Sequence, residues 1–486
     1  MDPFHRMASC KKTPCYMNLE YPGMFAIFVS HQWLSRGHPD PHGQQTEVLR
    51  NALQALIHGS LHVEPHTPGM LYYDFAFEWD SSMTANVANG YLFFDWFAIP
   101  QLTARQEGVN EEVTKSDAAR AVQSIPAYVE ACSLFLALVP ELKHADTGAI
   151  CNYTSWLSRG WCRAELWLWL LSNRLDNNVV VIYSATECEF MFQYDWQHNN
   201  IASGDFTVPS DRAIVCQLGE TAAAGKLKHL QIGGPVDAYR YFAAHKHKLL
   251  GLQPLCSDVD DFLTLFQFGS LEAAASNHTG MTGLLCAVYA GHVQLLRLLV
   301  ESRADVNQRV RGLGEFGFYD SMTPLIIATR SNQGPDILHG LIELGADVDA
   351  RVQQSGISAA GLVRSPEQVQ VLSHARADFQ SCSEPLGFCP LTSAAGFANH
   401  ETIASLLAAR CNVNPQLQGI GCGPLHAVAL FSRGKTDALK KAQLLLSSRA
   451  DLDLRASPSG WYGWLCQKAQ MESNVWGLEA CKAKAR

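Results

Sequence analysis

The chain has 486 residues, of which 47% are hydrophobic and 10% aromatic, so it is long enough for two to four domains with sizeable cores. Its formal net charge of −9 excludes the basic footprint with which general nucleic-acid binders neutralise phosphates, so we expect no nucleic-acid partner. The 15 cysteines form no C-x-x-C pair, and pairs such as Cys382 and Cys389 lack the spacing of zinc ligands. Reduced thiols and a cytoplasmic location are therefore expected.

The N-terminus has no hydrophobic signal core, and we expect residues 1–21 to be a flexible segment. No apolar run of the chain reaches the ~18 residues that a membrane-spanning helix needs. The sequence therefore predicts no membrane partner.

Residues 22–220 are predicted to form an α/β domain. Short apolar or aromatic runs alternate there with helix-like segments, which is typical of βαβ units, a parallel sheet and helices on both faces. The predicted strands are 24–30, 90–96, 132–139 and 179–184, and the predicted helices are 46–59, 115–131 and 162–175. Because sites in such sheets gather at the carboxyl ends of the strands, we expect Ser30 to Trp33, Asp95 to Gln101 and the loop after Val139 to share one rim.

The segment that follows has weaker signals. Residues 204–218 are compatible with a hairpin added to the sheet, and residues 221–268 are predicted to form a helical connector that caps the next domain. Nothing in this segment indicates chemistry.

The C-terminal half repeats a short phrase. It reads ADVN, ADVD, ADFQ, CNVN and ADLD, ending at Asn307, Asp349, Gln380, Asn414 and Asp453. The phrases recur every 31 to 42 residues, and a pair of short helical patterns precedes most of them. A period near 33 residues indicates a solenoid of stacked helix pairs.

This pattern resembles the ankyrin repeat. MTPLIIATR at 322–330 and GPLHAVAL at 423–430 match its T-P-L-H-x-A opening, and GHVQLLRLLV at 291–300 matches its middle. The resemblance implies an all-α array over residues 269–470, with about five repeats and a protein partner, followed by a C-terminal tail at 471–486. Two departures stand out: residues 356–380 lack the opening, so that repeat is expected to be degenerate, and an insert after Asn307 lengthens one loop.

The N-terminal domain has a resemblance of its own. FAIFVSHQW at 25–33 is similar to the first strand and loop of Toll/interleukin-1-receptor (TIR) domains, and SWLSRGWCRAEL at 155–166 is similar to their W-C-x-x-E segment. LFFDWFAIPQ at 92–101 and IPAYVEACSLFLALVP at 125–140 look more like the related heterokaryon-incompatibility domains. The resemblance implies a flavodoxin-like fold and self-association into a homo-oligomer.

The same resemblance implies a candidate enzyme site. Several TIR domains hydrolyse NAD with the glutamate that lies four residues after the tryptophan, and Trp161 and Glu165 have that spacing here. Glu165 is the candidate catalytic acid, and Ser30, Arg36, Asp95 and Trp161 are candidate residues for binding the nucleotide. A carboxylate can stabilise the oxocarbenium-like centre that forms when the nicotinamide–ribose bond breaks. NAD is then a substrate, and no bound cofactor is expected.

A simpler interpretation remains open for Glu165. An acid in the first turn of a helix complements the helix dipole, and Ser158 could cap that helix, with Glu165 at its solvent edge. Many TIR-like domains also self-associate without any activity. The sequence therefore favours an intracellular interaction and signalling protein, with NAD hydrolysis regulated by the repeats as the alternative.

A metal site is not expected. His38, His42, His58, His62 and His66 cluster in sequence, but their spacing is more typical of solvated histidines than of convergent ligands.

Overall fold

The computed structural model describes residues 24–64, 79–98, 111–174, 178–191, 199–251, 258–353, 355–384, 386–431 and 437–459. The expected N-terminal segment 1–21 and C-terminal tail 471–486 lie outside these residues. The chain divides into two compact units, Met1–Gln253 and Pro254–Arg486. Among the described residues, no helix is both long enough and apolar enough to cross a bilayer.

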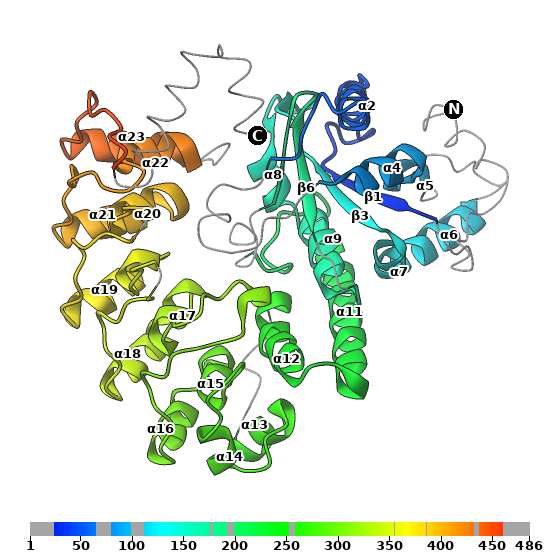
Figure 1. The fold of residues 1–486 in the computed structure, drawn as a ribbon. Coiled ribbons are helices and arrows are strands. Elements are labelled where there is room, and N and C mark those ends of the chain that lie inside the picture. Colours follow the sequence, from blue (N-terminus) through cyan, green and yellow to red (C-terminus); the bar gives the residue numbers. More distant parts are fainter. Residues whose placement is uncertain are drawn as a thin grey trace. The chain divides into compact units, whose positions relative to one another are not determined.

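The first unit is built on a five-stranded sheet (Figure 1). Its strands are β1 (Ala26–His31), β2 (Tyr91–Phe94), β3 (Leu134–Leu138), β6 (Val179–Ser184) and β7 (Glu187–Phe190), and their order is β2-β1-β3-β6-β7. The first four strands are parallel, as predicted. The fifth strand is antiparallel, because only two residues separate β6 from β7 and such a short turn joins antiparallel neighbours. The sheet is therefore mixed and mostly parallel.

Side chains alternate between two cores along each strand, as the strand period of two requires. On β1, Ala26 and Phe28 face one core, whereas Ile27 and Val29 face the other. The first core also contains residues of α7 (Ile125–Ala131), α8 (Tyr153–Ser158), α9 (Gly160–Leu171), α11 (Asp211–Gly233) and α12 (Val236–Leu250). The second contains residues of α2 (Gln44–Ile57) and α4 (Ser81–Asn89). Both faces of the sheet are thus covered by helices.

The remaining elements of this unit are short or peripheral. Among the described residues they are α5 (Asp95–Ala98), α6 (Glu111–Gln123) and the two-stranded sheet of β4 (Leu142–Lys143) and β5 (Ile150–Cys151). The hairpin expected within 204–218 is wrong: helix α11 begins there at Asp211, in a segment whose Val215 and Leu218 are buried at a spacing of three. The expected boundary at residue 220 lies inside this helix.

The second unit consists of helix pairs that follow one another along the chain (Figure 1). The helices are α13 (Val259–Phe266), α14 (Leu271–Ala275), α15 (Gly283–Ala290), α16 (Val293–Glu301), α17 (Pro324–Arg330), α18 (Pro335–Glu343), α19 (Pro366–His374), α20 (Pro390–Phe397), α21 (His400–Ala408), α22 (Pro424–Phe431) and α23 (Ala438–Ser447), with 3₁₀ helices η3 (Gly314–Phe316) and η4 (Ala360–Leu362). Side-chain caps begin many of them; Thr282 accepts from the N–H of Leu285, and Thr323 from that of Ile326.

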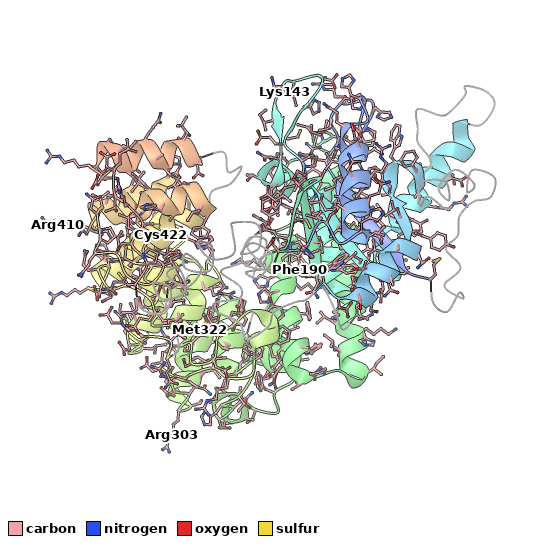
Figure 2. The ribbon with its side chains drawn as sticks, turned by 45° about the horizontal axis from the view of Figure 1, so that its top comes forward. Lys143, Phe190, Arg303, Met322, Arg410 and Cys422 are labelled. Atoms are coloured by element: carbon pink, nitrogen blue, oxygen red, sulfur yellow. The ribbon has the colours of Figure 1, made fainter. Side chains whose placement is uncertain are left out.

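The turns after α16, α18, α19, α21 and α23, the second helices of the last five pairs, each have a left-handed residue. Glycine is the usual choice at such a helix end, and Gly345 takes this place after α18 with φ +94°. The other four turns use arginine instead, at Arg303, Arg376, Arg410 and Arg449. Arg303 and Arg410 extend away from the ribbon in Figure 2, so their side chains are free of the packing between helices.

The last residue of each of the first four repeated phrases joins one repeat to the next. The side-chain amide of Asn307 donates to the carbonyl of Gly345 at 3.0 Å, and its oxygen accepts from the N–H of Asp347 at 2.7 Å. Asn414 forms the same two bonds to Arg449 and Asp451. A side-chain amide suits this position because it both donates and accepts.

One repeat differs from the others. Its first helix is η4, with three residues, whereas α15, α17, α20 and α22 have seven or eight. It lies in the segment that lacks the T-P-L-H opening, and 3₁₀ hydrogen bonds are weaker than those of an α-helix.

We therefore expect backbone amides of residues 356–380 to exchange with solvent faster than those of residues 280–307. Hydrogen exchange followed by mass spectrometry of the two segments measures this difference directly. Equal protection of both would contradict it.

Candidate functional site

The carboxyl end of β1 presents two polar side chains on opposite faces of the sheet. The hydroxyl of Ser30 donates to the Oε2 of Glu165 at 2.6 Å. The indole N–H of Trp156 donates in turn to the Ser30 oxygen at 3.0 Å. All three side chains are buried, so the Glu165 carboxyl group is held in a fixed orientation against the end of the strand.

The neighbouring residue, His31, forms a second pair on the other face. Its Nε2 lies 2.8 Å from the Oδ1 of Asp95, the residue that follows β2. The imidazole stacks on Phe94 with 4.2 Å between ring centroids. Its other nitrogen, Nδ1, is buried and has no hydrogen-bond partner among the described residues. That leaves one buried polar atom whose hydrogen-bonding capacity is unused.

Burial and neighbouring charges shift the pKa values of Glu165, His31 and Asp95 in different directions. Burial, and then the negative charge of Asp95, raises the pKa of Glu165 to about 8. Burial disfavours the charged form of His31, but the Asp95 carboxylate outweighs it and raises the pKa of the imidazole. Burial likewise opposes ionisation of Asp95, and the charge of His31 outweighs it and lowers the pKa of that carboxyl. The end of the sheet thus has an ionised Asp95 on one face and, on the other, a Glu165 that keeps its proton near neutral pH.

The burial of Glu165 contradicts the interpretation of this residue as a solvated helix-start acid. Arg159, not Ser158, is the N-cap of α9, and the Ser158 hydroxyl donates to the Ser155 carbonyl in the preceding helix. Glu165 is the sixth residue of α9, beyond its first turn, and only 9% of its surface is exposed. Nor is it paired with Arg163, whose guanidinium donates to the carbonyls of Leu157 and Asn200.

The other candidate residues are placed less closely together. Ser30 and Asp95 lie at the same end of the sheet as Glu165, as the rule for strand ends predicts. The indole N–H of Trp161 donates to Asp211 at the start of α11 at 3.0 Å. Arg36 has an exposed side chain, and its backbone N–H donates to Asp146 at 2.6 Å. The structure therefore brings Ser30 to Glu165 and leaves Trp161 and Arg36 with other partners.

No metal centre is found in the described part of the chain, where no group of three or more His, Cys, Asp or Glu could hold an ion. His38, His42 and His58 are exposed or partly exposed, and His66 lies outside the described residues.

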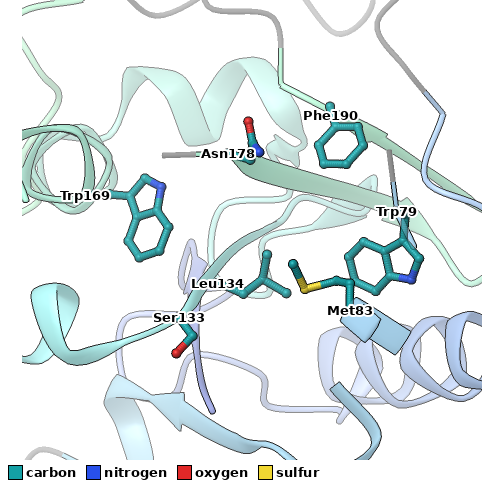
Figure 3. Close-up of a pocket in the computed structure, with 7 residues that line it drawn as sticks. All are labelled: Trp79, Met83, Ser133, Leu134, Trp169, Asn178 and Phe190. Atoms are coloured by element: carbon teal, nitrogen blue, oxygen red, sulfur yellow. The ribbon is translucent and has the colours of Figure 1, made fainter. Parts of the chain in front are cut away.

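A small pocket lies at the other end of the strands, near the amino ends of β3 and β6 (Figure 3). It is lined by Trp79, Met83, Ser133, Leu134, Trp169, Asn178 and Phe190. The pocket shares no residue with the Ser30–Glu165 pair.

Sequence reasoning placed His31 on the rim but missed its pairing with Asp95, and it missed the role of Trp156 altogether. Strand alternation offers a signal for His31, because successive residues at the end of β1 must face opposite sides and each polar residue then needs its own partner. Trp156 carries no such signal, since its contact with Ser30 joins residues 126 positions apart.

One family model matches the chain: the ankyrin-repeat model, with three copies, matches residues 256–352. These residues are ankyrin repeats. The helix pairs continue beyond residue 352 with α19 to α23, so the C-terminal unit consists of helical repeats as far as residue 447. The search of curated proteins finds no match to this chain.

Proposed function

We propose that this protein binds a partner protein through its ankyrin repeats and that its α/β unit self-associates, as an interaction and signalling protein would. The observation that supports partner binding most directly is a row of hairpin loops, one per repeat, that touch one another along the array. Glu384 donates its N–H to the carbonyl of Ser355 at 2.6 Å, and Ile420 donates to that of Leu386 at 3.1 Å. A continuous edge of this kind suits an extended protein surface.

The hairpin tips carry exposed polar residues that could contact such a partner. They are Arg311, Gln353, Glu384 and Gln418. The insert after Asn307 is folded rather than loose, because Leu313 and Phe318 are buried and Arg330 lies over the Phe318 ring at 5.1 Å. The lengthened loop thus presents a defined surface.

Proximity labelling with the full chain tests this proposal. Reversing two tip charges, with Arg311→Glu and Glu384→Lys together, should deplete the labelled partner at least tenfold, since exposed substitutions of this kind leave the fold intact. The matched control, Arg303→Glu and Glu301→Lys, likewise keeps the net charge, lies at the end of α16 away from the hairpins, and should leave labelling unchanged. Equal labelling by all three chains would contradict binding through the hairpins.

A second function is supported by Glu165: hydrolysis of NAD by the α/β unit. Burying an ionisable carboxyl group costs the folded state free energy, so its presence in the interior suggests a role other than stability. Glu165 lies beside Ser30 at the carboxyl end of β1, which is where parallel sheets place their reactive groups. Strand order reverses there, between β1 and β3, and that switch point is where such sheets bind nucleotides.

The chemistry follows from the ionised form of Glu165. Nicotinamide leaves the ribose as a neutral molecule with the bonding electrons, and the carboxylate stabilises the cationic ribose until water adds. In this proposal Ser30 positions the acid. Asp95, Trp161 and Arg36 remain candidates for binding the nucleotide, for which Trp161 would have to exchange its present partner. Nicotinamide release by the full chain at high, clustered concentration is the test, and its absence there would end this second proposal.

A further inference from the structure

The loop between α19 and α20 brings two cysteines together across a tight hairpin. The N–H of Ser383 donates to the carbonyl of Phe388 at 2.8 Å, and the N–H of Gly387 donates to the carbonyl of Ser383 at 2.9 Å. Cys382 and Cys389 flank this pair of bonded residues. Residues that flank a hydrogen-bonded pair in an antiparallel arrangement have Cα atoms ~4.5 Å apart, which is within the range that a disulfide spans.

Both cysteines are free, and their thiols lie close enough for each to shift the pKa of the other. Cys389 is buried, whereas Cys382 is only partly buried, so one side of the pair faces solvent. The neighbouring hairpin has no such pair: its corresponding residues are Arg351 and Ser358, which flank the bonded Val352 and Ile357.

Cys389 occupies the position that threonine takes in the T-P-L opening of other repeats. It is the N-cap residue of α20, as Thr323 is of α17. Its sulfur lies 3.1 Å from the hydroxyl of Thr392. Interaction with the Cys382 thiol outweighs burial and lowers the pKa of Cys389, and the same interaction raises the pKa of Cys382. Helix N-termini also favour a thiolate, so Cys389 is the nucleophile of the pair and Cys382 the resolving thiol.

We propose that Cys382 and Cys389 form a redox modification site, at which peroxide converts the dithiol to a disulfide. The Cys389 thiolate attacks one oxygen of hydrogen peroxide, so that the O–O bond breaks, hydroxide leaves and the sulfur becomes a sulfenic acid. The sulfur of Cys382 then attacks the sulfenic sulfur, an S–S bond forms, and the hydroxyl leaves with the thiol proton as water. Two thiols and one peroxide thus give one disulfide and two waters.

The site lies within the row of hairpins. Gly387, inside the closed loop, packs against the backbone of Gln418, and Glu384 is bonded to Ser355. A disulfide between 382 and 389 therefore fixes the hairpin that connects the loops on either side. This inference does not depend on the activity of the α/β unit.

Oxidation of the two cysteines in the full-length chain can be measured from the masses of its tryptic peptides. Peptide 377–410 contains Cys382 and Cys389 as its only cysteines, and peptide 411–433 contains Cys411 and Cys422 as its only cysteines. Burial raises the pKa of Cys411 to about 12 and also raises that of Cys422, so the second peptide is an internal control. After brief treatment with hydrogen peroxide and alkylation under denaturing conditions, the first peptide should lose two hydrogens and take no alkyl groups. The second should be alkylated twice.

Variants separate the steps. Cys382→Ser should stop the reaction at a sulfenic acid on Cys389, which a 1,3-dione traps, and Cys389→Ser should slow oxidation of Cys382 at least tenfold. Thr392→Val keeps both thiols and should slow disulfide formation several-fold, which tests the site even where a cysteine variant does not fold. Equal oxidation of both peptides, or added oxygen in 377–410 without loss of two hydrogens, would overturn the proposal.

Discussion

Replacing Glu165 by Gln should abolish nicotinamide release from NAD and, in the same protein, stabilise the α/β unit at pH 8. The two effects have one cause, which is the buried charge. Glutamine keeps the size of the side chain and can still accept the hydrogen bond from Ser30, but it has no charge to stabilise a cationic ribose. Loss of such a charge typically removes several kcal/mol of transition-state stabilisation, so release should fall about a hundredfold or more.

The stability effect follows from the raised pKa of Glu165. Between its ordinary value of 4.5 and about 8, the folded chain holds a proton that the unfolded chain has lost. The contribution of this group to stability is therefore complete below pH 4.5 and is lost as the pH rises to about 8. That shift corresponds to ~5 kcal/mol as an order of magnitude. Glu165→Gln removes this dependence, so its advantage over the wild-type chain should grow with pH across the window.

Urea denaturation of the two proteins at pH 5 and pH 8 measures the change in stability, and nicotinamide release measures activity. Because cleavage requires the ionised acid, kcat/KM of the wild-type chain should rise as the pH approaches 8. The matched control is Glu47→Gln, which removes an exposed acid from the first turn of α2 and should alter neither quantity appreciably. A Glu165→Gln protein that is less stable at pH 8, or that releases nicotinamide at the wild-type rate, would remove Glu165 from the site.

Local patterns in the sequence predicted most of the first unit. Runs of apolar residues predicted its four parallel strands, because strands buried on both faces are apolar along their buried length, as β3 and the first four residues of β6 are. Its antiparallel fifth strand was not predicted, since ECEF alternates polar and apolar residues over only four positions, and only the two-residue turn before it determines its direction. Helix α11 was mistaken for a hairpin because Val208 and Pro209 precede it and its own apolar periodicity is slight.

The candidate site was predicted only in part, for a different reason. The position of Glu165 in the W-C-x-x-E segment singled it out, and the rule for strand ends placed Ser30 and Asp95 at its rim. Which of these residues touch one another depends on how α9 packs on β1, and that packing joins residues 135 positions apart. No local pattern specifies such a contact, so the pairing of His31 with Asp95 and the contact of Trp156 with Ser30 became visible only in the folded chain.

Replacing Gly387 by Ala should destabilise the repeat array by ~3 kcal/mol or more. Gly387 has φ +77°, and an added Cβ would lie 2.2 Å from the carbonyl oxygen of Gln418 in the next hairpin. Alanine in a left-handed conformation costs ~1–2 kcal/mol by itself, and separating two packed backbones adds to that. The hairpins would have to move apart, and the hydrogen bond from Ile420 to Leu386 would lengthen with them.

Gly312 provides the control that separates the two contributions. Its φ of +76° matches that of Gly387, but nothing lies within 4 Å of the position of its Cβ. Gly312→Ala should therefore show only the backbone effect, and the difference between the two variants measures the contact between hairpins. Urea denaturation followed by circular dichroism, with hydrogen exchange of residues 386–431, supplies both numbers. Equal losses of unfolding free energy in the two variants would mean that the hairpins beyond residue 352 do not stack. A larger loss in Gly387→Ala, as expected, would show that the stacked array extends past the three matched copies.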